Sequence, residues 1–322
     1  MARFRYASTI VFLLLSLPNI VQAQQDENPG QILESNVDDT AKISRLLTMV
    51  ELYYQADPEL AMKYCDALYR LSDSLNITTA IIDASLYKSK MFFYRGDMDS
   101  AKIICRNAIL LSDSIQDEIR LADLTYFDAV LLYVTEGPLA AIDLFRVSFG
   151  YYSRISDSTG MSNALNGIGV AFYEQSKYDS AVYYLLNAEL IAELNGYTAE
   201  LGKVLINLGL VYDSMDENDK AINCYQRSIK YNEENNNMIN VAKAIHNTGN
   251  IYVQERDLDS AWFMYNKGLE MNLEMNHPEG IANSYIGLGD VSDFFGNYSK
   301  AQECFKKAKN YYGLIGHKQG VL

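Results

Sequence analysis

A period of 40 residues is the feature of this sequence that most constrains its fold. An alanine recurs at that spacing, and a glycine stands twelve residues before each of four copies. The alanines are Ala181, Ala221, Ala261 and Ala301, and the glycines are Gly169, Gly209, Gly249 and Gly289. The same phase extends backwards to Ala141, Ala101 and Ala61. A constant period of this length is typical of stacked repeats, in which each unit buries its apolar face only against its neighbours.

Each unit contains two stretches with helical periodicity. In one unit, Val204 and Leu208 fall on one face, and Ile222 and Tyr225 do so after a polar turn at 216–219. The spacing predicts two antiparallel amphipathic helices per unit, which cross at the glycine. Aspartates two positions before the alanine are expected to cap the second helix: Asp99, Asp179, Asp219 and Asp259. Residues that tolerate a left-handed backbone are expected to end helices at one phase: Asn76, Gly196, Asn236, Asn276 and Gly316.

This pattern resembles the tetratricopeptide repeat (TPR) family, in which a small residue and an aromatic residue on one helix meet alanine, aromatic and small residues on the next. The resemblance implies an all-α fold, a right-handed α-solenoid of seven antiparallel helix pairs with an inner groove and no domain boundary. The sequence departs from the usual 34-residue unit, and Met49, Ser89 and Ala129 stand at the glycine phase. The expected repeats are 42–81, 82–121, 122–161, 162–201, 202–241, 242–281 and 282–321.

The N-terminus has a different character from the repeats. Residues 1–23 begin with Arg3 and Arg5, continue as an uncharged apolar run and end with small residues at Ala23. This pattern predicts a cleaved secretory signal peptide, because the run is too short to span a bilayer. Residues 24–41 are acidic and poor in aliphatic side chains, so we expect a flexible leader. The mature chain is expected to be secreted or periplasmic, with no membrane span.

The composition and the absence of common motifs exclude several classes of function. The chain has 41 acidic and 27 basic residues, for a net charge of −14, which argues against general nucleic-acid binding. The sequence lacks the common catalytic and phosphate-binding motifs, and its three histidines are too sparse for a metal cluster. We therefore expect no catalytic residue, no metal and no cofactor. The expected partner is a protein or peptide.

The four cysteines occupy packing phases of the repeats. Cys65 and Cys105 share one phase, and Cys224 and Cys304 share another. Neighbouring helices lie about 8–10 Å apart, whereas a disulfide needs α-carbons within roughly 7 Å. We therefore expect four buried free thiols.

Two sets of side chains are candidates for ligand binding. The first is a set of aromatic residues four positions after the glycine phase, which the TPR resemblance places on the inner groove: Tyr53, Phe93, Tyr133 and Tyr173. These rings either anchor a ligand or pack between adjacent first helices, and the sequence leaves both open. The second set is polar and lies on groove-facing phases: Asn163, Asn166, Lys203, Asn207, Lys243, His246, Asn247 and Asn250.

The polar set suits an extended peptide. An amide side chain both donates and accepts, so it matches a peptide unit of any sequence. In related long-repeat proteins, asparagines at the phase of Asn207 and Asn247 hold the backbone of a bound peptide. Lys203 and Lys243 would favour a carboxylate in an otherwise acidic protein. Ordinary solvated polar positions are the alternative.

Two functions follow from these patterns. The first is a non-catalytic scaffold that binds a peptide or protein segment in its groove. The second is the extracytoplasmic sensor part of a membrane-bound regulator, such as a histidine kinase or DNA-binding regulator, because Gly316–Leu322 repeat the phase that leads into another helix. Alternatively, the uncapped face around Phe305, Tyr312 and Leu314 is a homodimer interface.

Overall fold

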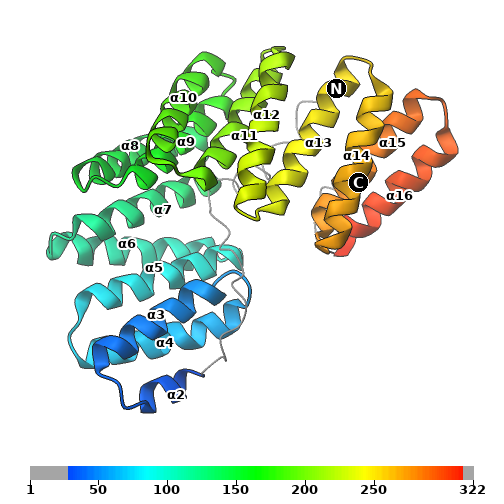
Figure 1. Ribbon diagram of the computed structural model, residues 1–322. Helices are drawn as coiled ribbons and strands as arrows, with labels where there is room; N and C mark the ends of the chain where they lie inside the picture. The colour runs from blue at the N-terminus through cyan, green and yellow to red at the C-terminus, as the bar shows by residue number, and fades with distance from the viewer. Residues whose placement is uncertain (1–27, 315–322) are drawn as a thin grey trace. The chain divides into compact units, whose positions relative to one another are not determined.

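The computed structural model describes residues 28–314 (Figure 1). This part of the chain forms helices α2 to α16 without a strand, which confirms the all-α repeat fold. The chain divides into two compact units, Met1–Lys177 and Tyr178–Leu322. The division contradicts the expectation of an array without a domain boundary. It falls inside the expected repeat 162–201, where the sequence period continues without interruption and so gives no signal.

The first unit contains eight described helices, each packed against the next in the chain. They are α2 (Pro29–Glu34), α3 (Asp39–Tyr53), α4 (Pro58–Ser74), α5 (Thr78–Tyr94), α6 (Met98–Ser114), α7 (Glu118–Glu136), α8 (Pro138–Arg154) and α9 (Ser158–Glu174). From α3 onward the odd-numbered helices are the first helices of the repeats. Adjacent first helices also contact one another within the unit.

The second unit contains seven described helices with the same packing order. They are α10 (Tyr178–Asn195), α11 (Thr198–Ser214), α12 (Asn218–Glu234), α13 (Met238–Gln254), α14 (Leu258–Glu274), α15 (Pro278–Phe294) and α16 (Tyr298–Leu314). First helix α13 contacts both α11 and α15. None of the helices described in either unit is long and apolar enough to cross a membrane.

The repeats keep the expected spacing but not the expected bounds. Helices α5, α7, α9, α11, α13 and α15 begin at Thr78, Glu118, Ser158, Thr198, Met238 and Pro278, which are 40 residues apart. Each expected repeat therefore starts one helical turn inside a first helix. The physical boundary is the left-handed residue that ends the preceding helix, with φ of 56° at Asn76, 71° at Gly196, 54° at Asn236 and 49° at Asn276. Gly316 lies outside the described residues.

Part of the expected flexible leader is helical. In α2, Asn28 Oδ1 accepts from the Gln31 backbone N–H at 3.0 Å, and the Gln31 side chain accepts from the Asn28 N–H at 2.7 Å. Pro29 occupies the first turn, and Ile32 is completely buried in a core cluster with Leu46. The leader prediction is therefore wrong for Pro29–Glu34, because a capping box and one buried side chain are enough to hold a short helix on the first repeat. Residues 24–27 lie outside the described part.

The residues that cap helices α6 and α14 lie two positions before the aspartates that were expected to cap them. Asp97 caps α6 and Asp257 caps α14, where each carboxylate accepts from the backbone N–H three residues on at 3.1 Å. Asp99 and Asp259 lie inside the first turn instead. Their carboxylates can interact favourably with the helix dipole, but they do not cap the N-terminus of the helix.

The cysteine prediction is confirmed, since all four are buried free thiols. Cys65 Sγ lies 3.1 Å from the Ala84 carbonyl oxygen, between α4 and α5. Burial raises the pKa of Cys65 and of Cys224 to about 12. These thiols are therefore protonated and unreactive near neutral pH.

Candidate functional site

A polar stripe on α13 is the candidate site of the second unit. Lys243, His246, Asn247 and Asn250 follow helical spacing on one face of this helix, and all four are half-buried. The Tyr265 hydroxyl donates to Asn250 Oδ1 at 2.7 Å, which fixes the amide from helix α14. The structure brings these four of the predicted residues together because they share one helix.

The imidazole of His246 lies against the ring of Tyr265, with ring centroids 5.2 Å apart. Burial lowers the pKa of His246 to about 4, so the ring is neutral at pH 7. Its Nδ1 atom is buried and has no hydrogen-bond partner in the described structure. A neutral imidazole with an unsatisfied nitrogen can bind a donor or an acceptor, depending on its tautomer.

Of the two lysines among the predicted site residues, Lys243 belongs to the stripe and Lys203 lies on the adjacent first helix α11. Burial lowers the pKa of Lys243, while the negative charge of Glu279 on α15 opposes that shift. Burial likewise lowers the pKa of Lys203, which is 6% exposed and has its Nζ atom 3.6 Å from Glu200 Oε1. Glu200 therefore pairs with Lys203, whereas Lys243 has no ion pair within 4.0 Å among the described residues.

Two of the remaining polar candidates are too buried to contact a ligand directly. Asn207 is 3% exposed on α11, and Asn166 is 2% exposed on α9. Asn163 is half-buried on α9, so it belongs with Asn166 to the first unit. The structure thus groups Lys203, Asn207 and the α13 stripe in one unit.

The aromatic set lies in the first unit, where packing accounts for most of it. Phe93 is 8% exposed and makes an edge-on contact with Phe127, with ring centroids 5.9 Å apart. Tyr133 is 6% exposed. Burial is the main reason that its pKa is raised, and the negative charge of Glu174 raises the pKa further. The half-buried Tyr53 stacks on Tyr64 at 6.0 Å. Tyr173 is half-buried at the end of α9. These contacts favour the packing alternative for Phe93 in particular.

A second polar cluster in the first unit was missed from the sequence. The Tyr87 hydroxyl donates to Glu51 Oε1 at 3.0 Å, and Lys90 Nζ lies 4.8 Å from the centroid of the Tyr87 ring. Burial lowers the pKa of Lys90, and the carboxylates of Asp123 and Glu51 oppose the shift. The available signal was weak: Asp123 stands at the phase that carries Lys203 and Lys243 in the second unit.

The described residues contain no group of three or more His, Cys, Asp or Glu side chains placed to hold a metal ion. The α13 stripe offers amide, imidazole and ammonium groups on one surface. Such a surface can hydrogen-bond to peptide units and attract a carboxylate.

Comparisons with known proteins agree with the repeat geometry. A tetratricopeptide repeat family model matches residues 160–234, and a second one matches residues 282–312. Tetratricopeptide repeats are therefore present within these two segments. Among curated proteins, the uncharacterized protein ycf37 of Guillardia theta is 28% identical over 131 residues, which cover 39% of this chain and 70% of that protein.

Several solved TPR structures share the fold. A signal transduction ATPase of the STAND class with a TPR sensor, from Pyrococcus horikoshii, has a TM-score of 0.70 at 13% identity, covering 91% of this chain and 45% of its own. A Rap protein complexed with the Competence and Sporulation Factor has a TM-score of 0.64 at 13% identity, covering 91% and 86%. BtubC from P. vanneervenii has a TM-score of 0.58 at 19% identity, covering 69% and 90%. At these identities the likeness is one of fold. This chain spans less than half the STAND protein.

Proposed function

We propose that the protein is a non-catalytic scaffold that binds an extended peptide or protein segment on the α13 face of its second unit. The observation that carries this proposal is the polar stripe of half-buried side chains on α13. Within it, Lys243 forms no ion pair within 4.0 Å in the described structure. The Rap protein solved with its bound factor supports a binding role for a chain of this fold.

The stripe suits an extended backbone. Asn247 and Asn250 are three positions apart, so their amides lie about 4.5 Å apart along the helix axis. Adjacent first helices about 10 Å apart would meet every third residue of a peptide that rises about 3.3 Å per residue. Lys243 favours a carboxylate on the ligand. Asn207 is too buried to touch the ligand directly, so we place it beneath the binding surface.

A peptide-library selection tests this proposal. Peptides enriched by the wild-type protein are titrated against Lys243→Ala/Asn247→Ala, which removes one cation and one amide from the stripe. We expect the dissociation constant to rise at least about tenfold, equivalent to about 1.4 kcal/mol. The matched control is Asn266→Ala/Lys267→Ala, which removes the same two residue types from α14. Equal binding by the stripe variant and the control would place the site elsewhere.

The proposed site of action is outside the cytoplasm. The signal-peptide pattern of residues 1–23 supports this location, although those residues lie outside the described structure. We also propose that the units are a 40-residue variant of the TPR repeat, which the spacing of the first helices supports. Mass spectrometry of protein from the extracellular or periplasmic fraction should find a mature N-terminus at Gln24. An intact Met1 in that fraction would contradict the cleavage.

A sensor is the second candidate function, and the TPR sensor in the STAND neighbour supports it. A sensor must change its conformation on binding, whereas a scaffold need not. Small-angle X-ray scattering with and without an enriched peptide separates the two. A changed scattering curve favours the sensor, and an unchanged curve favours the scaffold.

Homodimerisation stays a prediction. On α16, Phe305 is 40% exposed and Leu314 is 76% exposed. Tyr312 is less available, because its hydroxyl donates to Asn283 Oδ1 on α15. Sedimentation at increasing concentration checks the prediction, and Leu314→Glu should lower the dimer fraction.

A further inference from the structure

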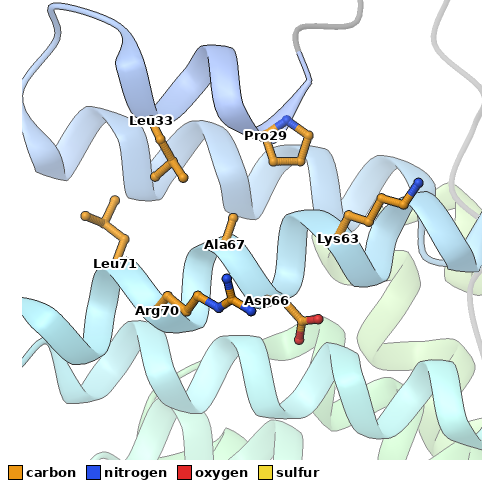
Figure 2. Close-up of a pocket in the computed structure, with 7 residues that line it drawn as sticks. All are labelled: Pro29, Leu33, Lys63, Asp66, Ala67, Arg70 and Leu71. Carbon is orange, nitrogen blue, oxygen red and sulfur yellow. The ribbon is translucent and has the colours of Figure 1, made fainter.

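A pocket of about 530 Å³ lies between α2 and α4 in the first unit (Figure 2). Pro29 and Leu33 line it from α2, and Ala67 and Leu71 line it from α4. Leu33 and Ala67 point toward one another across the pocket. The floor is therefore apolar. Leu33 is 38% exposed, so this apolar surface remains accessible.

Two free cations border this apolar floor. Lys63 and Arg70 are exposed and stand seven residues apart on α4. Neither forms an ion pair within 4.0 Å anywhere in residues 28–314. The acidic residue between them, Asp66, also lines the pocket, and it is already paired, with its Oδ1 atom 3.1 Å from Lys88 Nζ. The whole chain has a net charge of −14, whereas this pocket carries two cations, Lys63 and Arg70, that have no ion-pair partner within the described part of the chain.

We propose that this pocket docks an amphipathic helix of a partner protein, with two acidic residues seven positions apart and aliphatic residues between them. Seven residues of helix rise about 10.5 Å, so acidic groups at that spacing on the partner match Lys63 and Arg70 on α4. Aliphatic residues three and four positions after the first acid lie on the same face, over Leu33, Ala67 and Leu71.

The pattern of charge and apolar surface selects this occupant. A purely apolar segment would leave the two cations without partners, and a purely acidic one would leave the pocket floor exposed. A helix that carries both acidic and aliphatic residues can pair with the two cations and cover the apolar floor at the same time. This surface is separate from the α13 stripe, so the proposal stands or falls independently of the proposed peptide site.

The test uses a defined probe, an alanine-rich helical peptide of about 16 residues. It carries two glutamates seven positions apart, with leucines three and four positions after the first. The control peptide has lysines in place of the glutamates. Fluorescence anisotropy of each labelled peptide is measured against the wild-type protein and against Lys63→Glu/Arg70→Glu. Circular dichroism checks that both proteins are folded, which is expected because both positions are exposed.

We expect the wild-type protein to bind the glutamate peptide at least about tenfold more tightly than the lysine peptide, and the double variant to reverse that preference. A second control, Arg95→Glu/Lys267→Glu, makes the same charge change at exposed residues that do not line the pocket and should leave the preference unchanged. An absent preference, a preference that the double variant keeps, or equal loss in the control overturns the proposal. Binding of phosphatidylglycerol vesicles without binding of the glutamate peptide also overturns it, in favour of an anionic membrane surface.

Discussion

Gly209 and Tyr225 show, at the scale of single residues, how closely the two helices of a repeat approach. A Cβ atom built on Gly209 would lie 2.3 Å from Cε1 of Tyr225, which is completely buried. The same contact recurs one period later, where a Cβ on Gly249 would lie 2.7 Å from Cε1 of Tyr265. The repeated glycine therefore makes room for the repeated aromatic ring of the second helix.

Gly209→Ala should lower the free energy of unfolding by about 1–2 kcal/mol, because the overpacking cost of about 1–3 kcal/mol exceeds the helix-propensity gain of up to about 1 kcal/mol. Gly150→Ala on α8 is the matched control, since its Cβ would meet only Arg154 Nη1 at 3.8 Å. The control should be neutral or stabilising. Urea denaturation of both variants measures the difference, and equal effects would contradict the close approach at Gly209.

His246 should make the protein less stable in mild acid. Its folded pKa of about 4 lies below the ordinary value of 6.5, so between these values the unfolded chain binds a proton that the folded chain excludes. The stability that depends on neutral His246 is complete above about pH 6.5 and falls as the pH drops toward 4. Raised pKa values at Asp123 and Asp213 act in the opposite direction, so the comparison must isolate His246.

The comparison uses the free energy of unfolding of the wild type and of His246→Gln at pH 7 and pH 5. The loss between these pH values should be smaller in the variant by about 1–2 kcal/mol. His277 remains in both proteins and cancels. An identical loss in the two proteins would show that the imidazole titrates normally in the folded state.

At the scale of elements, Arg120 ties α7 to α5. Its Nε donates to Asp83 Oδ1 at 2.8 Å and its Nη2 donates to Asp83 Oδ2 at 2.7 Å, in a bidentate pair. Its Nη1 donates to Asp117 Oδ2 at 2.7 Å, and that carboxylate also caps α7. Half-buried bidentate pairs hold their geometry better than exposed pairs.

Arg120→Met should destabilise the first unit by about 1–3 kcal/mol, because two half-buried carboxylates lose charged hydrogen bonds. Arg146→Met removes an exposed ion pair with Asp143 and should cost less than about 0.5 kcal/mol. Thermal denaturation followed by circular dichroism measures both. Equal effects would mean that the link between α5 and α7 adds no stability.

The sequence predicted the elements that repeat and missed those that do not. The contact of Gly289 with Phe305 could be predicted because it recurs at a fixed period. Helix α2 could not, since six residues carry no period and its stability depends on Asn28 and Ile32. The Tyr87–Glu51 bond was missed for a related reason: it joins residues 36 apart on neighbouring repeats, and no other repeat has this pair.

At the scale of the whole molecule, the chain is organised as two compact units. Repeat proteins make contacts mainly between neighbours, so parts of an array can unfold separately. Trp262 is the only tryptophan and lies on α14 of the second unit. Its fluorescence therefore reports that unit, whereas circular dichroism reports the helices of both.

Urea unfolding should give different midpoints for Trp262 fluorescence and circular dichroism. Gly209→Ala should shift the fluorescence midpoint, and Arg120→Met should shift the dichroism curve with a smaller effect on fluorescence. Coincident transitions in the wild type and both variants would mean that the two units unfold as one.

Hydrogen exchange measured by mass spectrometry is the sharpest test of the proposed peptide site, because it locates ligand contact along the chain. The wild-type protein is compared with and without a peptide enriched from the library. We expect slower exchange in α13, Met238–Gln254, with smaller effects on α11 and α15. Protection confined to the first unit or to the second helices of the repeats would contradict a binding site on the α13 stripe.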